Sequence, residues 1–402
     1  DKPIFEDVLS TQPQLSTTRS SHASHASMVS SPSMAVAALA VVVATMVTDS
    51  PSMVVVSALS AATSPPKAKE YAPGKRRLET NVPGPLFVDE SCIDCDTCRW
   101  MAGDIFDAAG GKSYVKAQPH DGTDDWARAL KAAAACPVGS IRTEGSPPGR
   151  EAKAARDAFP VAVDAERVPN VYHAGFHSSK SFGAAPYVLA LPGDDDDTTT
   201  KGCVLVDSPR YNSALAKAIE ARFGAPKYML LTHKDDVADH AKWKERFPDM
   251  KRVLHKLEVR GPRQWPYIDT RDVEVQLEGD GPWELDAAGP GLQLLFVPGH
   301  SSGHLAFLAD PSLTGGDGAL FTGDHFAYSA RRNRLGAAPQ FSWDLGVHAD
   351  SIEALADLDF LHIFPGHGRS VAFADAADRR AKIVAAAKTF RQDPWGVDEP
   401  PQ

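Results

Sequence analysis

Four of the five cysteines in this 402-residue chain follow a spacing that constrains the fold more than any other feature of the sequence. The segment "CIDCDTCRW" supplies Cys92, Cys95 and Cys98, and "AAAACPVGSI" supplies Cys136, which precedes a proline. An iron–sulfur cubane needs four converging thiolates, and short spacers let one loop aim three of them while a distant fourth closes the cage. Since no second trio exists for Cys136 to join, the spacing predicts one [4Fe–4S] cluster held by all four cysteines.

A structural zinc site is the alternative for the same four cysteines. Zinc sites more often use paired C-x2-C knuckles, whereas here a lone cysteine lies far downstream and precedes proline. Because four of the five cysteines have ligand spacing, a secreted disulfide framework is not indicated, and we expect a reducing compartment.

Residues 84–146 around these cysteines resemble the single-cluster bacterial-type ferredoxins. The matching segments are "GPLFVDESCIDCDTCRWMAGDIF", a strand-like "KSYVKAQP" and "DDWARALKAAAACP". In the last segment Trp126, Leu130 and Ala133 recur at helical spacing. The resemblance implies a ferredoxin-like α+β domain that transfers electrons and has a redox partner.

The first 83 residues differ from the rest in composition. Residues 1–66 are rich in Ser, Ala and Val and poor in acidic residues, as transit peptides are, although arginine is scarce. The apolar run Met34–Val47 is shorter than the roughly 20 residues that a membrane-spanning helix needs. We expect a disordered chloroplast (plastid stroma) transit peptide with a Pro-rich linker over residues 1–83, and no stable membrane span. A secretory signal or a plain disordered tail is the alternative.

The net charge bears on the class of partner, and the length bears on the number of domains. A net charge of −10 argues against a nucleic-acid partner. At roughly 150 residues per domain the chain holds two domains plus extra sequence. The segment "PPGREAKAARDAF" predicts a helical connector over residues 147–159, and a larger unit follows over residues 160–402.

In this larger unit four strand-like runs end with His or Asp. They are "MLLTHKDDVADH", "LLFVPGHSSGH", "ALFTGDHFA" and "HIFPGHGRS". Each apolar run leads into a turn, so its polar side chain emerges at a strand end, where ligand loops gather. Gly299, Gly323 and Gly366 directly precede candidate ligands, and glycine permits a tight turn and close backbone approach.

His300 in "PGHSSGH", Asp324 in "TGDH" and His367 in "PGHG" resemble motifs three to five of the metallo-β-lactamase superfamily. The resemblance implies an α/β fold, an αββα sandwich, with a one- or two-metal site at one edge. It also implies that Asp324 is the bridging carboxylate and a catalytic residue.

The second motif departs from the family pattern His-x-His-x-Asp-His. Asp235 replaces the second histidine, and Asp239 and His240 match the final pair only after a two-residue insertion. We expect the insertion to be a helical adjustment that points Asp239, a catalytic candidate, and His240 at the metal, with Asp235 or Asp236 within reach. The alternative is an ordinary capped helix. Carboxylate oxygen in place of nitrogen shifts the preference from zinc toward iron or manganese. The expected ligands of the one or two ions are His233, Asp235, Asp239, His240, His300, Asp324 and His367.

Three function classes follow from the two resemblances. The first is a metallohydrolase similar to glyoxalase II and related thioesterases, acting on a small-molecule substrate such as a thioester. The second is an iron-dependent oxidoreductase, similar in logic to the flavodiiron proteins, to which the ferredoxin domain feeds electrons. The third is a non-catalytic interaction protein with an altered metal site.

The cysteine spacing makes a direct prediction about cofactor content. Anaerobically purified protein should hold about four irons with labile sulfide, and Cys136→Ser should lose or convert the cluster, because the cage then lacks its fourth thiolate. Elemental analysis and sulfide determination measure this. Wild-type protein with one zinc and no sulfide would contradict the prediction.

Overall fold

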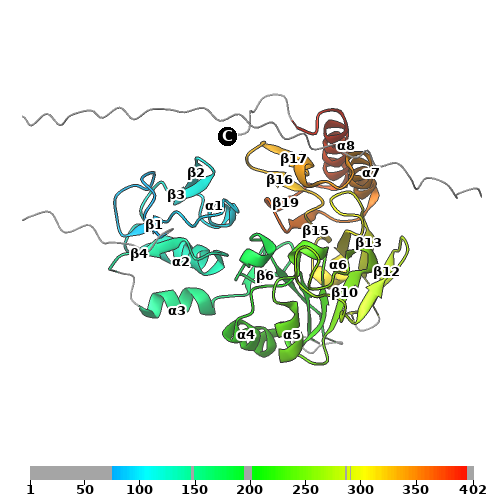
Figure 1. Cartoon of the computed structure of the whole chain (residues 1–402), viewed down its shortest axis with the longest axis horizontal. Coiled ribbons are helices and arrows are strands. Elements are labelled where there is room, and N and C mark those ends of the chain that lie inside the picture. The colour runs from blue at the N-terminus through cyan, green and yellow to red at the C-terminus, as the bar shows by residue number, and fades with distance from the viewer. Residues whose placement is uncertain (1–74, 146–148, 194–201, 286–287, 290, 396–402) are drawn as a thin grey trace, which may run out of the picture. The chain divides into compact units, whose positions relative to one another are not determined.

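The computed structural model describes residues 75–145, 149–193, 202–285, 288–289 and 291–395 (Figure 1). All of them belong to one compact unit. Nearly all of the expected transit peptide and linker lies outside the described residues, and the plastid location stays a prediction. Within the described residues, every helix is too short or too polar to cross a membrane.

Residues 75–145, called here the N-terminal part, consist of two strand pairs and two helices. The elements are β1 (Leu86–Val88), β2 (Phe106–Ala109), β3 (Lys112–Val115), β4 (Ile141–Thr143), α1 (Thr97–Met101) and α2 (Asp125–Ala135). β1 pairs with β4 and β2 with β3, all antiparallel. Gly110 and Gly111 both have positive φ, as a two-residue hairpin turn between β2 and β3 requires. The predicted strand and helix are confirmed as β3 and α2.

The expected linker ends earlier than predicted. The side-chain oxygen of Asn81 accepts hydrogen bonds from the amides of Val88 (2.9 Å) and Val115 (3.0 Å). Arg77 forms an isolated bridge with Asp89. Because these groups satisfy buried backbone donors of β1 and β3, residues 77–83 belong to the N-terminal part and not to a free linker.

The predicted connector helix is confirmed as α3 (Gly149–Asp157). After it, residues 160–395, called the C-terminal part, build two sheets. The seven-stranded sheet has the order β11-β10-β9-β8-β7-β6-β5, antiparallel from β5 to β8 and parallel from β8 to β11. Its strands are β5 (Val161–Ala162), β6 (Val171–His173), β7 (Tyr187–Ala190), β8 (Cys203–Val206), β9 (Pro226–Leu230), β10 (Lys251–His255) and β11 (Val275–Leu277).

The second sheet has six strands in the order β12-β13-β14-β15-β18-β19. In this sheet β15 and β18 are parallel, and all other neighbouring strands are antiparallel. Its strands are β12 (Trp283–Glu284), β13 (Leu292–Phe296), β14 (Leu305–Ala309), β15 (Ala319–Gly323), β18 (His362–Pro365) and β19 (Val371–Ala372); a separate hairpin joins β16 (Ala327–Ser329) to β17 (Arg334–Gly336).

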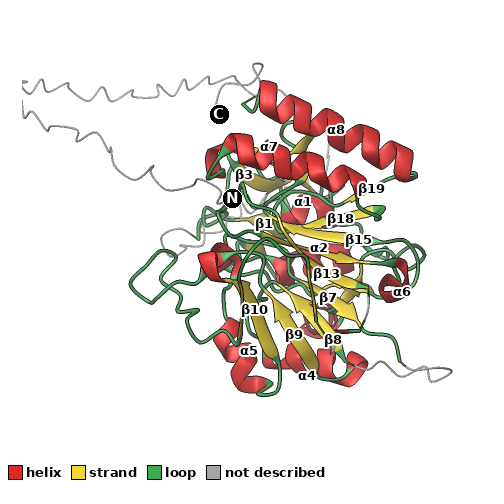
Figure 2. Cartoon of the chain, turned by 90° about the vertical axis from the view of Figure 1, so that its right-hand side faces the viewer, coloured by secondary structure: helices red, strands yellow, loops and turns green. Residues whose placement is uncertain are grey.

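Helices cover the outer faces of both sheets, so the expected αββα sandwich is confirmed (Figure 2). α4 (Ser213–Phe223) and α5 (His240–Arg246) pack on the seven-stranded sheet, and α7 (Leu345–Ala354) and α8 (Ala376–Gln392) on the other. Side-chain caps start several of these helices. For example, Asn212 accepts from the amides of Ala214 and Leu215 at the start of α4.

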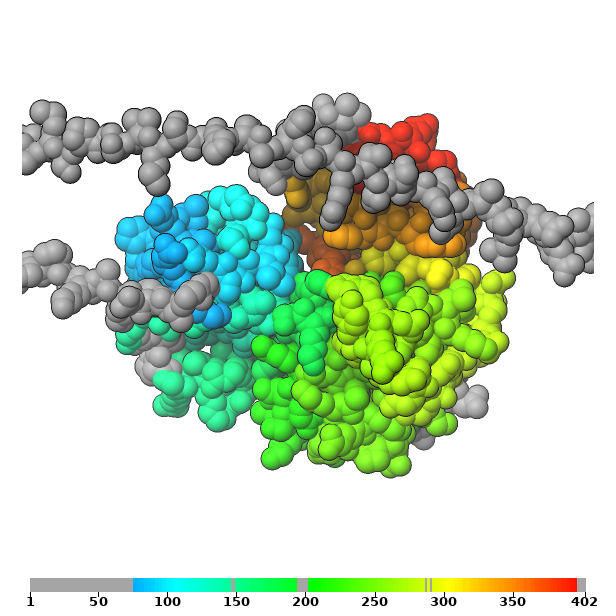
Figure 3. Space-filling model, viewed as in Figure 1, coloured from blue at the N-terminus to red at the C-terminus, as the bar shows by residue number. Residues whose placement is uncertain are grey.

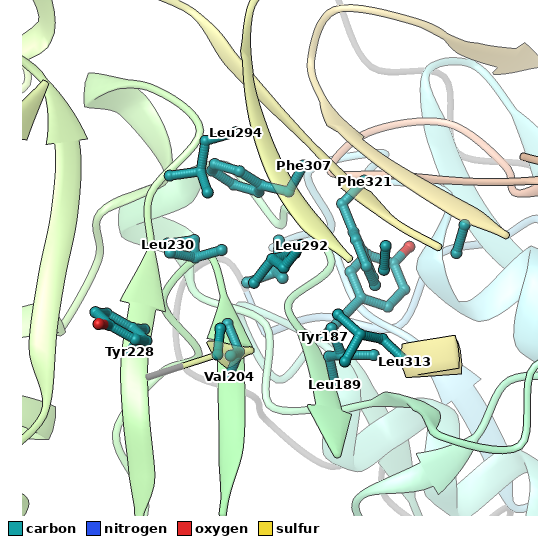
Figure 4. Close-up of a cluster of buried hydrophobic side chains, with 14 of the residues drawn as sticks. Tyr187, Leu189, Val204, Tyr228, Leu230, Leu292, Leu294, Phe307, Leu313 and Phe321 are labelled. Carbon is teal, nitrogen blue, oxygen red and sulfur yellow. The ribbon is translucent and has the colours of Figure 1, made fainter. Parts of the chain in front are cut away.

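The main core lies between the sheets (Figure 4). Alternate residues of each strand point inward, because side chains in a strand alternate between its faces. Leu189 of β7, Val204 of β8 and Leu230 of β9 thus meet Phe307 of β14 and Phe321 of β15. All five are completely buried. This core fixes the strand ends from which the polar motifs emerge.

Removal of a ring from this core should destabilise the C-terminal part. We expect Phe321→Ala to lower the free energy of unfolding by about 3–5 kcal/mol, because the lost burial adds to the cost of a cavity. Urea denaturation followed by near-UV circular dichroism measures this. The matched control is Phe341→Ala, whose ring is 65% exposed and should change stability by about 0.5 kcal/mol or less. Equal effects of the two substitutions would contradict this assignment of the core.

Candidate cluster site and metal centre

The four predicted cluster ligands converge as the spacing predicts. All four line one cavity in the N-terminal part: Cys92, Cys95, Cys98 and Cys136. None is in a disulfide. Asp94 and Asp96 adopt positive φ, which lets the loop wind around the cavity.

Hydrogen-bond donors surround the cysteine sulfurs. The amide of Ser113 donates to Cys92 Sγ (3.4 Å), the Ser140 hydroxyl lies 3.4 Å from Cys136 Sγ, and the Thr97 hydroxyl lies 3.4 Å from Cys95 Sγ. Donors of this kind stabilise thiolates and tune cluster potentials. Burial raises the pKa of Cys98 to about 12, so this thiol would be protonated until a cationic group replaces the proton. The donor set and the apolar cavity fit a [4Fe–4S] cluster.

The C-terminal part brings a second set of ligand candidates together at the ends of its strands. His233 follows β9, His300 follows β13, Asp324 follows β15 and His367 follows β18. Asp324 lies between the three histidines. Its oxygens are 3.9 Å from His233 Nε2, 3.7 Å from His300 Nε2 and 2.7 Å from His367 Nδ1. The four side chains thus converge at one place at the edge of the sheets.

Asp235 and Asp236 complete the centre. Both lie on the short 3₁₀ helix η2 (Lys234–Asp236), which follows His233 directly. The structure forms two groups of candidate ligands, and within each group all ligand atoms lie within 4.8 Å of one another. The first group is His233, Asp235 and His300, and the second is His233, Asp236 and Asp324. Both groups use His233, whose one free nitrogen can bind a single ion, so they are alternative positions for an ion. Asp235 stands with the ligands as expected from the sequence, whereas His367, hydrogen-bonded to Asp324, belongs to neither group.

Asp239 and His240 do not join this centre, which corrects the expectation that they converge with His233. Asp239 accepts hydrogen bonds from Lys180 (2.9 Å) and from the amide of Tyr211 (3.0 Å). His240 Nδ1 accepts from Arg252 (2.9 Å). The reason is local: η2 and a turn intervene, and α5 begins only at His240. Asp236, Asp239 and His240 therefore never share a helix face.

Orphaned polar atoms indicate that a cation fits the centre. Within the part of the chain that the structure describes, His233 Nε2, His300 Nδ1, Asp235 Oδ1 and both oxygens of Asp236 are buried without a hydrogen-bond partner. Such groups are costly to bury unless something pairs with them. A metal ion at this point would satisfy most of them.

The electrostatics of the centre also favour a bound cation. Burial raises the pKa of Asp236 well above its usual value, and the nearby Asp324 and Asp207 carboxylates add to this. Burial also opposes ionisation of Asp324, but the neighbouring histidines, His367 foremost, hold its pKa well below the usual range. Burial lowers the pKa of His233 far enough to keep it neutral, as a metal ligand must be. A dication would relieve the repulsion between the carboxylates.

The glycines next to the ligands have the role predicted from the sequence. A Cβ on Gly366 would lie 2.9 Å from Asp324 Oδ1 and 3.0 Å from Asp236 Oδ2. Gly323 has φ +49°, and a Cβ there would lie 2.6 Å from Thr232 Oγ1. The predicted close backbone approach is confirmed.

The sequence reading missed Asp207, the residue that orients His233. The amide and hydroxyl of Thr232 donate to Asp207 Oδ1 (2.8 and 3.0 Å). The Thr232 hydroxyl in turn accepts from His233 Nδ1 (3.0 Å), which leaves Nε2 free of a proton. The signal was present, because Asp207 ends the strand-like run "CVLVD" just as the recognised ligands end theirs.

Further histidines surround the centre without joining a ligand group. His304 Nε2 accepts from the backbone amide of Asp324 (3.2 Å) and so supports the ligand loop. His325 and His348 are buried together, with ring centroids 4.6 Å apart. His173 and His177 are buried and hydrogen-bonded to each other at 2.7 Å.

Comparison with known proteins supports both parts. Residues 88–143 match the family described as the 4Fe-4S single cluster domain of Ferredoxin I. The lactamase-like protein adaB of Aspergillus niger is 28% identical over 211 residues, covering 51% of this chain and 59% of adaB. The hydroxyacylglutathione hydrolase of Klebsiella pneumoniae is 33% identical over 131 residues, covering 30% and 47%. An archaeal metallo-beta-lactamase superfamily protein from Sulfolobus tokodaii shares 18% identity with a TM-score of 0.38, covering 55% of this chain and 83% of that chain.

The chain thus joins a part similar to single-cluster ferredoxins to a part similar to metallo-β-lactamase-type proteins. The N-terminal part is called the ferredoxin domain below, and the C-terminal part the metallo-β-lactamase domain. The chain spans about half the length of the first curated relatives that it matches.

Asp236 joins the candidate metal centre, whereas Asp239, which the motif suggests as a ligand, does not. We expect Asp236→Asn to weaken binding of Zn²⁺ or Fe²⁺ roughly 10–100-fold, because a buried carboxylate between His233 and Asp324 is lost. Asp239→Asn is the matched control and should leave the affinity unchanged, since lysines occupy that carboxylate. Competition with a chelator measures both affinities. The reverse ranking would restore Asp239 as a ligand and remove Asp236.

Proposed function

We propose that the chain is a metal-dependent hydrolase that cleaves a thioester or ester of a small molecule. The observation that carries the proposal is the pair of ligand groups that share His233, with Asp324 positioned between three histidines. The named relatives include hydroxyacylglutathione hydrolases, which supports a thioester as substrate.

The residues of the centre have separate roles in this proposal. A divalent ion would supply Lewis-acid activation of water and polarisation of the substrate carbonyl. Asp324 and Asp236 would hold the ion together with His233, and the Asp207–Thr232 pair keeps His233 in the tautomer that can bind it. Because these side chains are already oriented by hydrogen bonds, binding would need little reorganisation.

The centre is exposed on the side of His367, which gives a substrate access to it. The His367 side chain is 32% exposed, whereas that of His233 is fully buried. Next to His367, the exposed rings of Phe182, Trp265 and Tyr267 contact one another in sequence, with centroids 5.9 and 5.8 Å apart. They offer apolar surface for the organic part of a substrate.

An iron-dependent oxidoreductase is the second candidate. Two observations favour it: Asp235 supplies oxygen where the family pattern has a histidine, and the ferredoxin domain contacts the metallo-β-lactamase domain beside the centre. Figure 3 shows the ferredoxin domain, blue to cyan, abutting the green segment of the metallo-β-lactamase domain. In this case the cluster would deliver electrons for the reaction.

Paired substitutions separate the two candidates. For a hydrolase, we expect Asp324→Asn to lower kcat/KM for acyl-glutathione thioesters roughly 100-fold or more, because a carboxylate ligand of the ion is lost. Cys95→Ser should leave thioester cleavage nearly unchanged, since hydrolysis transfers no electron. Asp239→Asn serves as the folded, charge-matched control.

The measurement is thioester cleavage by protein whose metal content has been determined, with circular dichroism to confirm folding. Loss of cleavage in Cys95→Ser would favour the oxidoreductase. Absence of cleavage with zinc, iron and manganese each bound would reject the hydrolase.

A further inference from the structure

One cluster ligand, Cys95, lies directly against the metallo-β-lactamase domain. Cys95 is partly buried, whereas the other three cluster cysteines are buried. Gly183, at φ +91°, packs on it so closely that a Cβ there would lie 2.8 Å from Cys95 Cβ and 3.3 Å from Cys95 Sγ. Only glycine fits this contact, both for its φ and for its size.

The same segment reaches the metal centre at its other side. The Phe182 carbonyl oxygen lies 3.4 Å from His367 Nε2. Three residues further on, the amide of Ala185 donates to the Gly366 carbonyl (2.8 Å). Two adjacent residues, Phe182 and Gly183, therefore span the interval between a cluster ligand and His367, which is hydrogen-bonded to the candidate ligand Asp324.

Hydrogen bonds hold this segment in place. His177 Nδ1 donates to the Gly183 carbonyl (2.8 Å), so His177 Nε2 must accept from His173 Nε2 (2.7 Å). The Thr97 hydroxyl lies 3.1 Å from His177 Nδ1, whose one hydrogen it shares with the Gly183 carbonyl, and 3.4 Å from Cys95 Sγ, to which it can donate. The segment and the cluster loop thus share one buried network.

An ion pair clamps the two ligand loops together. Arg369, two residues after His367, donates from Nε and from its terminal nitrogen to the two carboxylate oxygens of Asp96 (2.9 and 3.2 Å). Asp96 is the residue after Cys95. A bidentate pair of this kind fixes orientation as well as distance.

We propose that Phe182 and Gly183, continued by His367 and its hydrogen bond to Asp324, form the connection through which a cluster held by Cys95 and a redox-active metal ion held by His233 and Asp324 exchange one electron. The cluster is oxidised by one electron as the ion is reduced by one, and a one-electron donor of the ferredoxin-reductant class reloads the cluster. The inference rests on the proposed metal centre. It goes beyond hydrolysis, because it lets the cluster set the oxidation state of the centre.

The first experiment tests proximity on the full chain, with cluster iron and centre metal determined beforehand. The cluster is reduced with dithionite, and its electron paramagnetic resonance signal is compared with Co²⁺ and with Zn²⁺ in the centre. We expect the signal to saturate at higher microwave power with cobalt, because a nearby paramagnetic ion speeds spin relaxation. Identical saturation with both metals would overturn the inference.

The second experiment tests the connection itself. With ferric iron in the centre, the cluster is photoreduced, and its reoxidation is followed optically; with zinc it should stay reduced. We expect Gly183→Ala to slow reoxidation several-fold, because the added Cβ pushes Cys95 away. Gly279→Ala is the matched control, since Gly279 has a similar φ of +86° and open space around its Cβ position. Equal rates in the two variants would overturn the proposed connection.

A second variant covers the case in which Gly183→Ala fails to hold the cluster. Arg369→Gln removes the clamp to Asp96 without touching a cysteine, and it should also slow reoxidation. An unchanged rate in Arg369→Gln would then count against the inference. Thioester cleavage is measured separately with zinc, so failure of electron exchange and failure of the proposed hydrolysis give different results.

Discussion

Buried negative charge at the strand ends is the constraint on which the rest of the metal centre depends. Asp207, Asp236 and Asp324 lie close enough that each disfavours ionisation of another. An uncompensated buried charge costs several kcal/mol. Thr232 compensates Asp207 with two hydrogen bonds, and histidines compensate Asp324. Asp236 has no partner among the described residues, so its burial is explained if a cation belongs there.

The same constraint accounts for the altered second motif. Two consecutive aspartates on a 3₁₀ turn place each carboxylate in a ligand group with His233. The resulting set is richer in oxygen than the histidine-based pattern and suits a harder ion such as iron or manganese. Arg252, buried beside Glu274, binds His240, and lysines bind Asp239; the residues that match the usual motif are thus in structural ion pairs and hydrogen bonds.

The sequence was most informative where local chemistry alone decides the structure. Cysteine spacing and glycines before strand-end ligands correctly predicted the cluster cavity and the convergence of His233, His300, Asp324 and His367. The register of the second motif could not be predicted, because whether α5 begins at residue 237 or 240 depends on tertiary contacts such as the one between Arg252 and His240. The same holds for the segment from 77 to 83, whose order comes from Asn81 bonding strands distant in sequence.

The contact between the domains argues for a functional connection. A domain that is merely tethered needs no glycine fitted against Cys95 and no bidentate ion pair between ligand loops, because interfaces between domains are usually loose. The glycine contact and the ion pair fix the position of the cluster loop relative to the loop that carries His367. A fixed position is what electron exchange between two centres requires, whereas a centre that only hydrolyses its substrate gains nothing from it. The interface therefore favours a role for the cluster beyond that of a tethered domain.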